Sequence, residues 1–140
     1  MSSEIRSLVQ SAEDLQLTLK RFLDKYQELE ENTNRSSLSV DERSQFVLLY
    51  QAQDEIWDAY NLLKRLDEPV RAEGYLEKGS NGRYEVDGLE LSSGSYIEYF
   101  SEDEDGGCYV PSRLEHNGGD YYIVTLGREK SIQGLKVRVK

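Results

Sequence analysis

The sequence predicts an α+β protein, with an antiparallel helical hairpin over residues 1–70 and a small antiparallel β-domain over residues 71–140. Two observations predict this class. In the first half, apolar residues recur every three or four positions, which is the spacing of an amphipathic helix. In the second half, short runs rich in aromatic and β-branched residues are separated, about every 8–12 residues, by turns that contain glycine.

The first helix is predicted from Ile5 to Leu29. Its apolar residues alternate in spacings of three and four, a heptad pattern that predicts a coiled-coil-like seam: Ile5, Leu8, Ala12, Leu15, Leu19, Phe22, Tyr26 and Leu29. Ser2 or Ser3 is the expected N-cap, because a hydroxyl accepts from the free N–H groups of the first turn. The acidic pair Glu30 and Glu31 should fray the last turn, since the C-terminal end of a helix is already negative.

The second helix is predicted to start after Ser39, because Ser39 and Glu42 have the spacing of a capping box. It ends before Pro69, since the residue preceding a proline avoids helical geometry. Its apolar stripe comprises Phe46, Leu49, Ala52, Ile56, Ala59 or Tyr60, Leu63 and Leu66, with Trp57 beside it. One partner helix covers only part of such a stripe. The β-domain, a second copy in a homodimer, or a foreign partner contacting Trp57 and Tyr60 is expected to cover the rest.

The strand half opens with two runs that flank Asn81-Gly82, the pair favoured in a two-residue type I′ hairpin turn. In the strand predicted at Ser95–Phe100, Ile97 and Tyr99 share one face, while Tyr96, Glu98 and Phe100 share the other. Five or six short strands predict a small barrel or a strongly curled sheet. The later strands are predicted at Leu89–Leu91, Ser95–Phe100, Cys108–His116 (where Pro111 indicates an edge or a bulge), Tyr121–Leu126 and Leu135–Val139.

Negative charge is spread over the whole chain. The net charge is −10, of which −6 belongs to residues 1–70 and −4 to residues 71–140. Such a chain repels a bare phosphate backbone and suits either solubility or a partner with a basic surface. A single cysteine excludes an intrachain disulfide and fits a reducing compartment. No apolar run is long enough for a signal peptide or a membrane span, so a cytoplasmic location is expected.

The sequence offers no catalytic constellation. Cys108 and His116 are the only thiol and the only imidazole, and eight residues of one strand would hold them about 26 Å apart. No nucleophile elbow and no phosphate-binding glycine loop is present. The acidic run Glu102–Asp105 does not have the spacing of a calcium-binding EF-hand loop. We therefore expect no enzymatic activity, no metal and no cofactor.

Several motifs of the C-terminal half occur in an order that resembles an uncharacterised small β-domain: Gly74-Tyr75-Leu76, Asn81-Gly82-Arg83-Tyr84, Leu91–Glu98, Tyr121-Tyr122-Ile123 and Gly134–Val139. This domain of unknown function is carried by short proteins of Gram-positive bacteria and of their phages, plasmids and integrative elements. The resemblance implies a setting on mobile DNA. The family has no established activity, so it assigns no functional residues.

The leading hypothesis is an acidic, non-catalytic inhibitor of the anti-CRISPR type, or a regulator, that binds a nucleic-acid-handling protein such as a nuclease. Its carboxylates, at Glu102, Asp103, Glu104 and Asp105, would occupy sites built for phosphates. The alternative is a nucleic-acid-binding accessory protein that stacks bases on tyrosines. A third hypothesis is a bare oligomerisation module. The candidate nucleic-acid contacts are Arg83, Tyr84, Arg113, Arg128, Lys130, Lys136 and Arg138.

Overall fold

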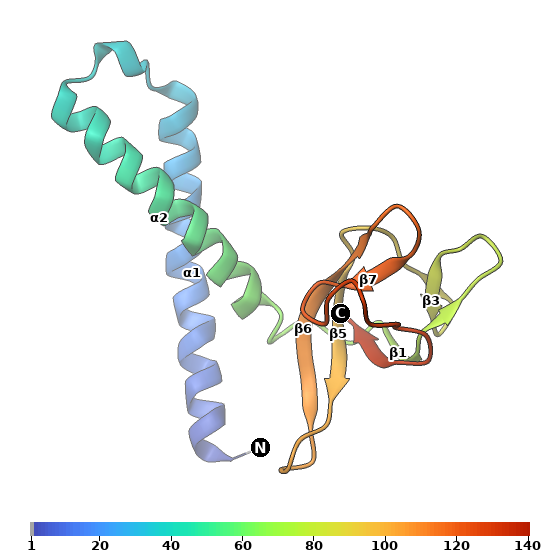
Figure 1. Cartoon of the computed structure of the whole chain (residues 1–140). Helices are drawn as coiled ribbons and strands as arrows, with labels where there is room; N and C mark the ends of the chain where they lie inside the picture. Colours follow the sequence, from blue (N-terminus) through green and yellow to red (C-terminus); the bar gives the residue numbers. More distant parts are fainter. Residues whose placement is uncertain (1) are drawn as a thin grey trace. The chain divides into compact units, whose positions relative to one another are not determined.

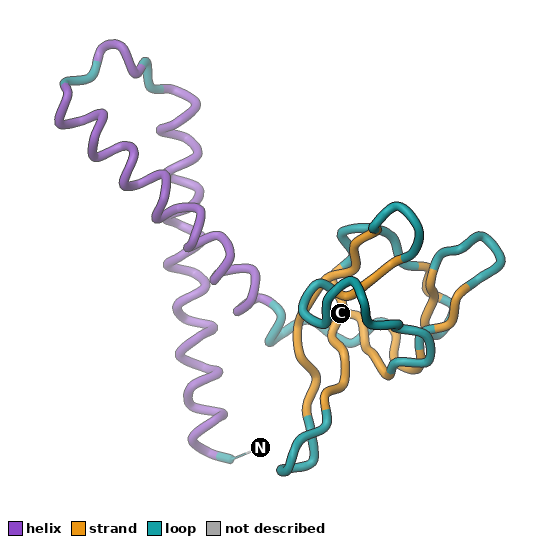
Figure 2. Tube along the Cα trace, viewed as in Figure 1, coloured by secondary structure: helices purple, strands orange, loops and turns teal. Residues whose placement is uncertain are grey.

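A computed structural model describes residues 2–140 and separates the chain into two compact units (Figures 1 and 2). The first unit ends at Glu68, and the second spans Pro69–Lys140. Two helices in the first unit and antiparallel strands in the second confirm the predicted α+β class.

The helical unit consists of α1 (Ser3–Asn32), a short 3-10 helix (Arg35–Ser37) and α2 (Val40–Lys64). Both long helices start at a serine cap, as the sequence predicts. The hydroxyl of Ser2 accepts from the N–H of Ile5 at 3.2 Å, and that of Ser39 accepts from the N–H of Glu42 at 3.1 Å.

The end of α1 differs from the expectation of a frayed last turn. The helix continues through Glu30 and Glu31 to Asn32. Two side-chain hydrogen bonds support this turn: the amide of Asn32 donates to the carbonyl of Glu28 at 2.8 Å, and the amide of Gln27 donates to the carboxylate of Glu31 at 3.1 Å. Both bonds link the last turn of α1 to the turn before it.

The two helices cross one another (Figure 1) and bury few side chains between them. Leu23, Tyr26 and Phe46 are the buried apolar residues among residues 2–68, and the ring centres of Tyr26 and Phe46 lie 5.8 Å apart. Near the other end of the pair, Gln16 donates to the carbonyl of Leu63 at 3.0 Å. The predicted coiled-coil-like seam is not confirmed, because much of the α1 heptad stripe remains exposed.

The β unit contains two antiparallel sheets. The larger sheet has the order β1-β8-β5-β6-β7, and the smaller has the order β2-β3-β4. Among residues 2–140 no pairing joins the edge strands β1 and β7, so the predicted barrel closure is not found. The strands are β1 (Ala72–Tyr75), β2 (Glu77–Lys78), β3 (Tyr84–Val86), β4 (Leu89–Glu90), β5 (Tyr96–Ser101), β6 (Cys108–His116), β7 (Tyr121–Ile123) and β8 (Lys136–Val139).

The prediction of a type I′ turn at Asn81-Gly82 is wrong. There, β2 and β3 are joined by a longer loop in which the N–H of Gly82 donates to the carbonyl of Gly79 at 3.0 Å. The geometry of a type I′ turn occurs instead at Asp87-Gly88, between the paired residues Val86 and Leu89. Both turn residues have positive φ, 48° and 79°, as this turn requires.

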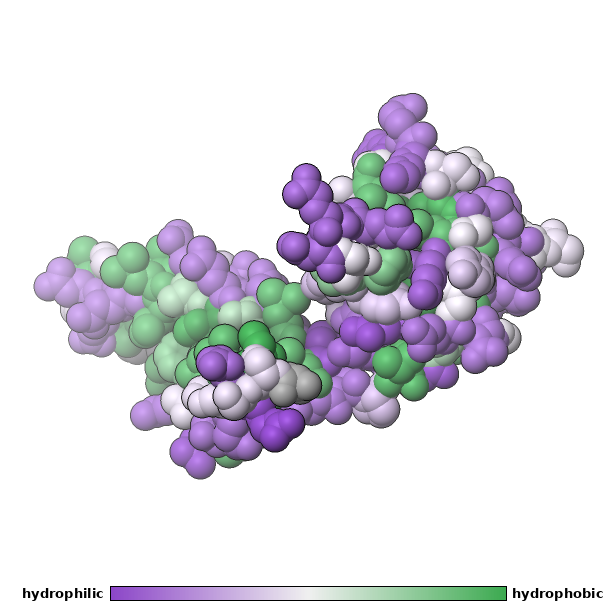
Figure 3. All heavy atoms as spheres, turned by 90° about the horizontal axis from the view of Figure 1, so that it is seen from below, coloured by the Kyte–Doolittle hydropathy of each residue, from purple (hydrophilic) through white to green (hydrophobic). Residues whose placement is uncertain are grey.

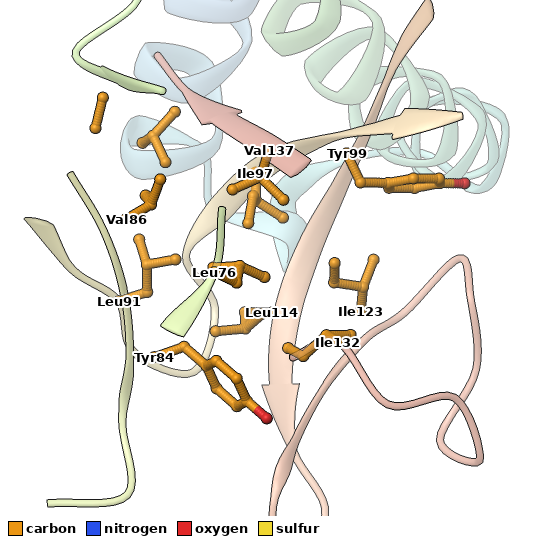
Figure 4. Close-up of a cluster of buried hydrophobic side chains, with 12 residues drawn as sticks. Leu76, Tyr84, Val86, Leu91, Ile97, Tyr99, Leu114, Ile123, Ile132 and Val137 are labelled. Carbon is orange, nitrogen blue, oxygen red and sulfur yellow. The ribbon is translucent and has the colours of Figure 1, made fainter. Parts of the chain in front are cut away.

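The core of the β unit lies between the two sheets (Figure 4). The predicted alternation along β5 is confirmed, since Ile97 and Tyr99 are buried in this core while Tyr96 and Phe100 point away from it. Val137 and Val139 of β8 are buried in the same way. The loop before β8 adds Ile132, which has no exposed surface although it belongs to no strand.

Pro111 lies in β6, which has a neighbour on each side in the sheet order. However, β7 pairs only with Leu114–His116, so at Pro111 the strand has β5 alone as its partner. On the other side of Pro111 there is no strand to accept a hydrogen bond, so the sheet loses no bond through the missing N–H of proline.

Candidate functional site

The acidic run forms the tip of the long hairpin built by β5 and β6. The two strands pair from Tyr96 opposite Arg113 to Ser101 opposite Cys108, and residues 102–107 close the loop. This hairpin reaches well beyond the other loops at its end of the β unit (Figure 1). We call the four exposed carboxylates Glu102, Asp103, Glu104 and Asp105 the acidic tip.

The backbone of the acidic tip is ordered by one of its own side chains. A carboxylate oxygen of Asp103 accepts from the N–H of Asp105 at 2.8 Å and from that of Gly107 at 3.1 Å. The carbonyl of Asp103 also accepts from the N–H of Gly106 at 3.2 Å. None of the four carboxylates forms an ion pair with a lysine or arginine of residues 2–140. The tip therefore presents uncompensated negative charge on a fixed loop.

Gly107 is the position at which this loop tolerates least change. Its φ is +102°, and a Cβ would meet the carbonyl oxygen of Ser101 at 2.7 Å and the ring of Phe100 at 2.9 Å. Gly106 has a similar φ of +109°, but no atom lies within 4 Å of its Cβ position.

We predict that Gly107→Ala reduces the free energy of unfolding of the β unit by about 2 kcal/mol, through backbone strain and the clash with Ser101. Gly106→Ala is the matched control, with strain alone and an expected loss of about 1 kcal/mol. Urea unfolding of the full-length variants measures both values. Equal losses at the two positions would contradict the close approach described for Gly107.

A row of aromatic and basic side chains crosses the face of the large sheet that is opposite the core. In register, Tyr75 of β1 faces Lys136 of β8, and Phe100 of β5 faces Tyr109 of β6. The ammonium group of Lys136 lies 4.9 Å from the ring centre of Phe100, which joins the two pairs. We call this set, with Arg138, the outer row. The guanidinium of Arg138 lies 4.3 Å from the ring centre of Tyr109. Cation–π contacts of this kind hold the cation and the ring in place.

Tyr109 connects the outer row to β1. Its hydroxyl donates to the carboxylate of Glu73 at 2.9 Å. Partial burial raises the pKa of Tyr109, and the hydrogen bond to Glu73 raises it further, so the phenol stays protonated and keeps donating. Tyr75 is the most open ring of the row, with 61% of its surface exposed.

Glu98 lies beneath this row and is the one buried charged residue of the described chain, with 5% of its surface exposed. The hydroxyl of Tyr96 donates to it at 2.6 Å, the guanidinium of Arg138 donates to its other oxygen, and the ammonium of Lys140 lies 3.8 Å away. Burial raises the pKa of Glu98, but these hydrogen bonds and positive charges together outweigh it, so its pKa lies below the ordinary value. The carboxylate therefore holds β5 and β8 together as a charged group.

The strands that carry the acidic tip and the outer row lie within one family match. Residues 74–139 match the model of a family described as a domain of unknown function, DUF5348. This supports the expected uncharacterised C-terminal domain. No curated protein matches the chain, and no solved structure matches it either.

Within the matched residues 74–139, the residues predicted to contact nucleic acid do not form one surface. Lys136 and Arg138 share the outer row, and Arg113 lies opposite Tyr96 on the same face of the sheet. Tyr84 is buried in the core with 2% of its surface exposed, so its ring offers no stacking platform.

The other three basic candidates lie away from the outer row. Arg83 forms an ion pair with Glu90 at 3.0 Å. Arg128 lies over the ring of Tyr122, 5.6 Å from its centre, and Lys130 is exposed in the loop before β8.

Trp57 and Tyr60 belong to the helical unit and contact each other with ring centres 6.0 Å apart. Trp57 is partly exposed and lines a groove of about 770 Å³. The α1 side of this groove carries mainly polar groups, including Lys20, Asp24 and Gln27. Trp57 is thus placed beside a groove that polar and apolar side chains both line.

Cys108 and His116 lie at opposite ends of β6. Cys108 is exposed, and His116 accepts from the N–H of Gly118 at 3.1 Å through Nδ1. Within residues 2–140, no group of three or more potential metal ligands converges. No helix in the same part of the chain is both long and apolar enough to cross a bilayer.

Sequence reasoning missed the outer row and the burial of Glu98. The alternation of β8 places Lys136 and Arg138 on one face, but the sequence does not reveal which strands lie beside β8. Pairing of β1 with β8 joins residues more than sixty positions apart, as Ala72 and Val139 illustrate. The one available signal was Glu98 itself, a carboxylate inside an otherwise aromatic and β-branched strand.

Proposed function

We propose that the chain is a non-catalytic interaction protein that inhibits or regulates a nucleic-acid-handling protein by placing its acidic tip in a basic groove. The observation that carries this proposal is the set of four carboxylates on an ordered hairpin loop, without a cationic partner in residues 2–140. Because we expect the C-terminal domain to occur on mobile elements, the concrete form of this proposal is an anti-CRISPR-type inhibitor of a nuclease.

The chemistry of the acidic tip supports this role. A groove that binds nucleic acid presents lysine and arginine at the spacing of phosphates, and carboxylates accept hydrogen bonds from the same groups. The net charge of −10 steers the encounter with a basic protein over distances up to about one Debye length, roughly 8 Å at physiological salt. The fixed loop lowers the entropy lost on binding, because its backbone is already ordered.

The outer row supplies the second part of the proposed interface. Phe100 and Tyr109 are the paired residues next to Ser101 and Cys108, from which the tip loop departs. Aromatic side chains at the centre of an interface contribute most of its affinity. Charged groups at the rim raise the rate of association and the selectivity for the partner. We therefore propose that Tyr75, Phe100 and Tyr109 anchor the partner that the acidic tip attracts.

The test is a capture experiment from a bacterial lysate treated with nuclease, using three tagged full-length chains. The first is the native chain. The second carries Glu102→Gln, Asp103→Asn, Glu104→Gln and Asp105→Asn, and Asn at 103 keeps the oxygen that accepts from the loop. The third is a matched control that removes four exposed carboxylates elsewhere in the β unit, by Glu77→Gln, Glu85→Gln, Asp87→Asn and Glu129→Gln.

We expect the native and control chains to retain the same basic, nucleic-acid-handling protein, and the tip-neutralised chain to lose it by at least tenfold. The reason is that only the tip substitutions remove charge from the proposed contact, although both sets change the net charge equally. Retention of the partner by the tip-neutralised chain would contradict the acidic tip as the contact.

A second candidate function, binding of single-stranded nucleic acid, is favoured by the outer row alone. The exposed ring of Tyr75 and the half-buried rings of Phe100 and Tyr109 lie beside Lys136 and Arg138 and offer stacking and charge to a strand. The acidic tip, which adjoins the same face, opposes this function. Capture that disappears after nuclease treatment, together with binding of a labelled oligonucleotide that weakens with salt, would favour it.

A further inference from the structure

The apolar stripes of both helices extend to one common face of the helical unit. On α1, this stripe repeats every seven residues at Leu8, Leu15, Phe22 and Leu29. On α2, two series with the same repeat are Leu49, Ile56 and Leu63, and Ala52, Ala59 and Leu66. Because seven residues make nearly two helical turns, each series stays on one side of its helix. We call these residues together the apolar hairpin face.

A groove between the helices shows that the two stripes meet on the same side. It has a volume of about 520 Å³ and is lined by Leu8, Ala12 and Leu15 of α1 together with Leu63 and Leu66, at the end of α2 and just beyond it. A second groove between the helices is lined both by charged and amide side chains, including Lys20, Asp24 and Gln27, and by Leu23 and Trp57. The groove between the start of α1 and the end of α2 is therefore lined almost entirely by apolar side chains, whereas the second groove is mixed. Figure 3 shows apolar side chains gathered over the helical unit, at the left of that view.

We propose that a second copy of this chain covers the apolar hairpin face, so that the protein is a homodimer held by four helices, two from each copy. Each helix of such an assembly contacts two neighbours, and its stripe then points between them rather than at one of them. This is the arrangement of the stripes here, since Leu23 and Tyr26 contact α2 while Leu8, Leu15 and Leu29 remain exposed.

The exposed area agrees with a dimer interface. Six large side chains of the helical unit on this side, Ile5, Leu8, Leu15, Leu29, Leu49 and Leu66, expose between 39% and 67% of their surface. With the alanines and half-buried residues between them, the apolar area is on the order of 800 Å². A partner contributes about 800 Å² to a standard stable interface, so one further copy suffices to cover the face.

The occupant follows from what the helical unit needs in order to fold. Three buried apolar residues among residues 2–68 are few for helices of 30 and 25 residues, and long helices take most of their stability from packing. Covering the face would stabilise the folded unit, and a second copy is a partner that is present wherever the chain is. A second hairpin also carries the identical pair of stripes, which allows the self-complementary contact of a two-fold dimer.

Charge separates this occupant from a basic foreign protein. Residues 1–70 carry a net charge of −6, so two hairpins repel one another at long range, and salt screens this repulsion. A dimer formed through apolar contacts is then unchanged or strengthened by salt, whereas binding of a basic partner is weakened.

The test is analytical ultracentrifugation of the full chain from 1 to 100 µM, with Leu15→Glu and its matched control Leu17→Glu. Leu17 is two residues away on the same helix and is more exposed than Leu15, 62% against 48%, but it points away from the apolar hairpin face. We expect twice the chain mass of 16.1 kDa for the native chain and for Leu17→Glu. We expect the single-chain mass for Leu15→Glu, because a buried carboxylate disfavours the dimer by at least a hundredfold in dissociation constant.

A second measurement keeps the proposal testable if Leu15→Glu unfolds. The midpoint of thermal loss of the helical circular dichroism of the native chain should rise with protein concentration, as dimer formation requires. A native chain that is monomeric at 100 µM with a concentration-independent midpoint overturns the proposal and leaves the face to a foreign partner. Equal disruption by the two glutamates overturns the assignment of the face.

Discussion

Tyr84→Ala is expected to reduce the free energy of unfolding of the β unit by about 3–5 kcal/mol, the range for removing a large buried aromatic side chain. Tyr84 lies in the core between the sheets, with its ring edge against Tyr121 at a centre distance of 6.4 Å. Hydrogen exchange of the β5 and β8 amides in the full chain measures the effect, since these strands open only when the core unfolds.

Tyr75→Ala is the control for this prediction, because the two tyrosines differ in burial and not in chemistry. Tyr75 is 61% exposed, so its removal should change the free energy of unfolding by less than about 0.5 kcal/mol. Similar exchange rates in the two variants would show that Tyr84 does not support the core as described.

Glu98→Gln is expected to reduce the free energy of unfolding by about 2 kcal/mol at neutral pH. The substitution keeps the shape of the side chain but removes the charge that Arg138 and Lys140 compensate, and it weakens the bond from Tyr96. Breaking a fully buried ion pair has a larger effect on stability. Here the side chain of Arg138 is 30% exposed, so solvent screens part of the loss.

The pH dependence of this effect has a definite sign. Because the folded pKa of Glu98 is lowered, the unfolded chain binds the proton more readily. The stabilisation by Glu98 is therefore fully present above the pKa of the unfolded chain and is lost as the pH falls, from about 5, through the folded pKa. Urea midpoints at pH 3–8 should show a constant difference between native chain and variant above about pH 6, and a narrowing one below about pH 5.

Glu77→Gln is the matched control for Glu98→Gln. Glu77 is exposed and lies opposite Glu85 in the small sheet, so its removal takes away one negative charge without breaking an ion pair among residues 2–140. A stability difference for Glu98→Gln that does not narrow at acid pH would contradict the ion-pair role of Glu98.

Local rules predicted the parts of the fold that neighbouring residues decide. Ser39 and Glu42 predicted the start of α2, because a cap depends on groups three residues apart. The alternation around Ile97 predicted which residues of β5 share a face, for the same reason. The exception was Asn81-Gly82, where the loop from Gly79 to Arg83 overrode the preference of the pair for a tight turn.

Contacts between distant residues decided what the sequence did not reveal. The outer row exists because β8 lies between β1 and β5, an order that no local pattern contains. Tyr84 was a plausible stacking residue by type alone, and its burial follows from packing of the small sheet against the large one. The heptad stripe of α1 predicted a helix correctly, but it did not reveal that Leu23 and Tyr26 would contact α2 while Leu15 stayed exposed.

The measurement that tests the proposed function most directly is a competition assay with the captured basic partner, purified and loaded with its labelled nucleic acid. The native chain should displace the nucleic acid in proportion to its binding, and so should the control that lacks Glu77, Glu85, Asp87 and Glu129. The chain neutralised at Glu102–Asp105 should not displace it. Displacement by the tip-neutralised chain, or a ternary complex in which the nucleic acid stays bound, would contradict an inhibitor whose carboxylates replace phosphates.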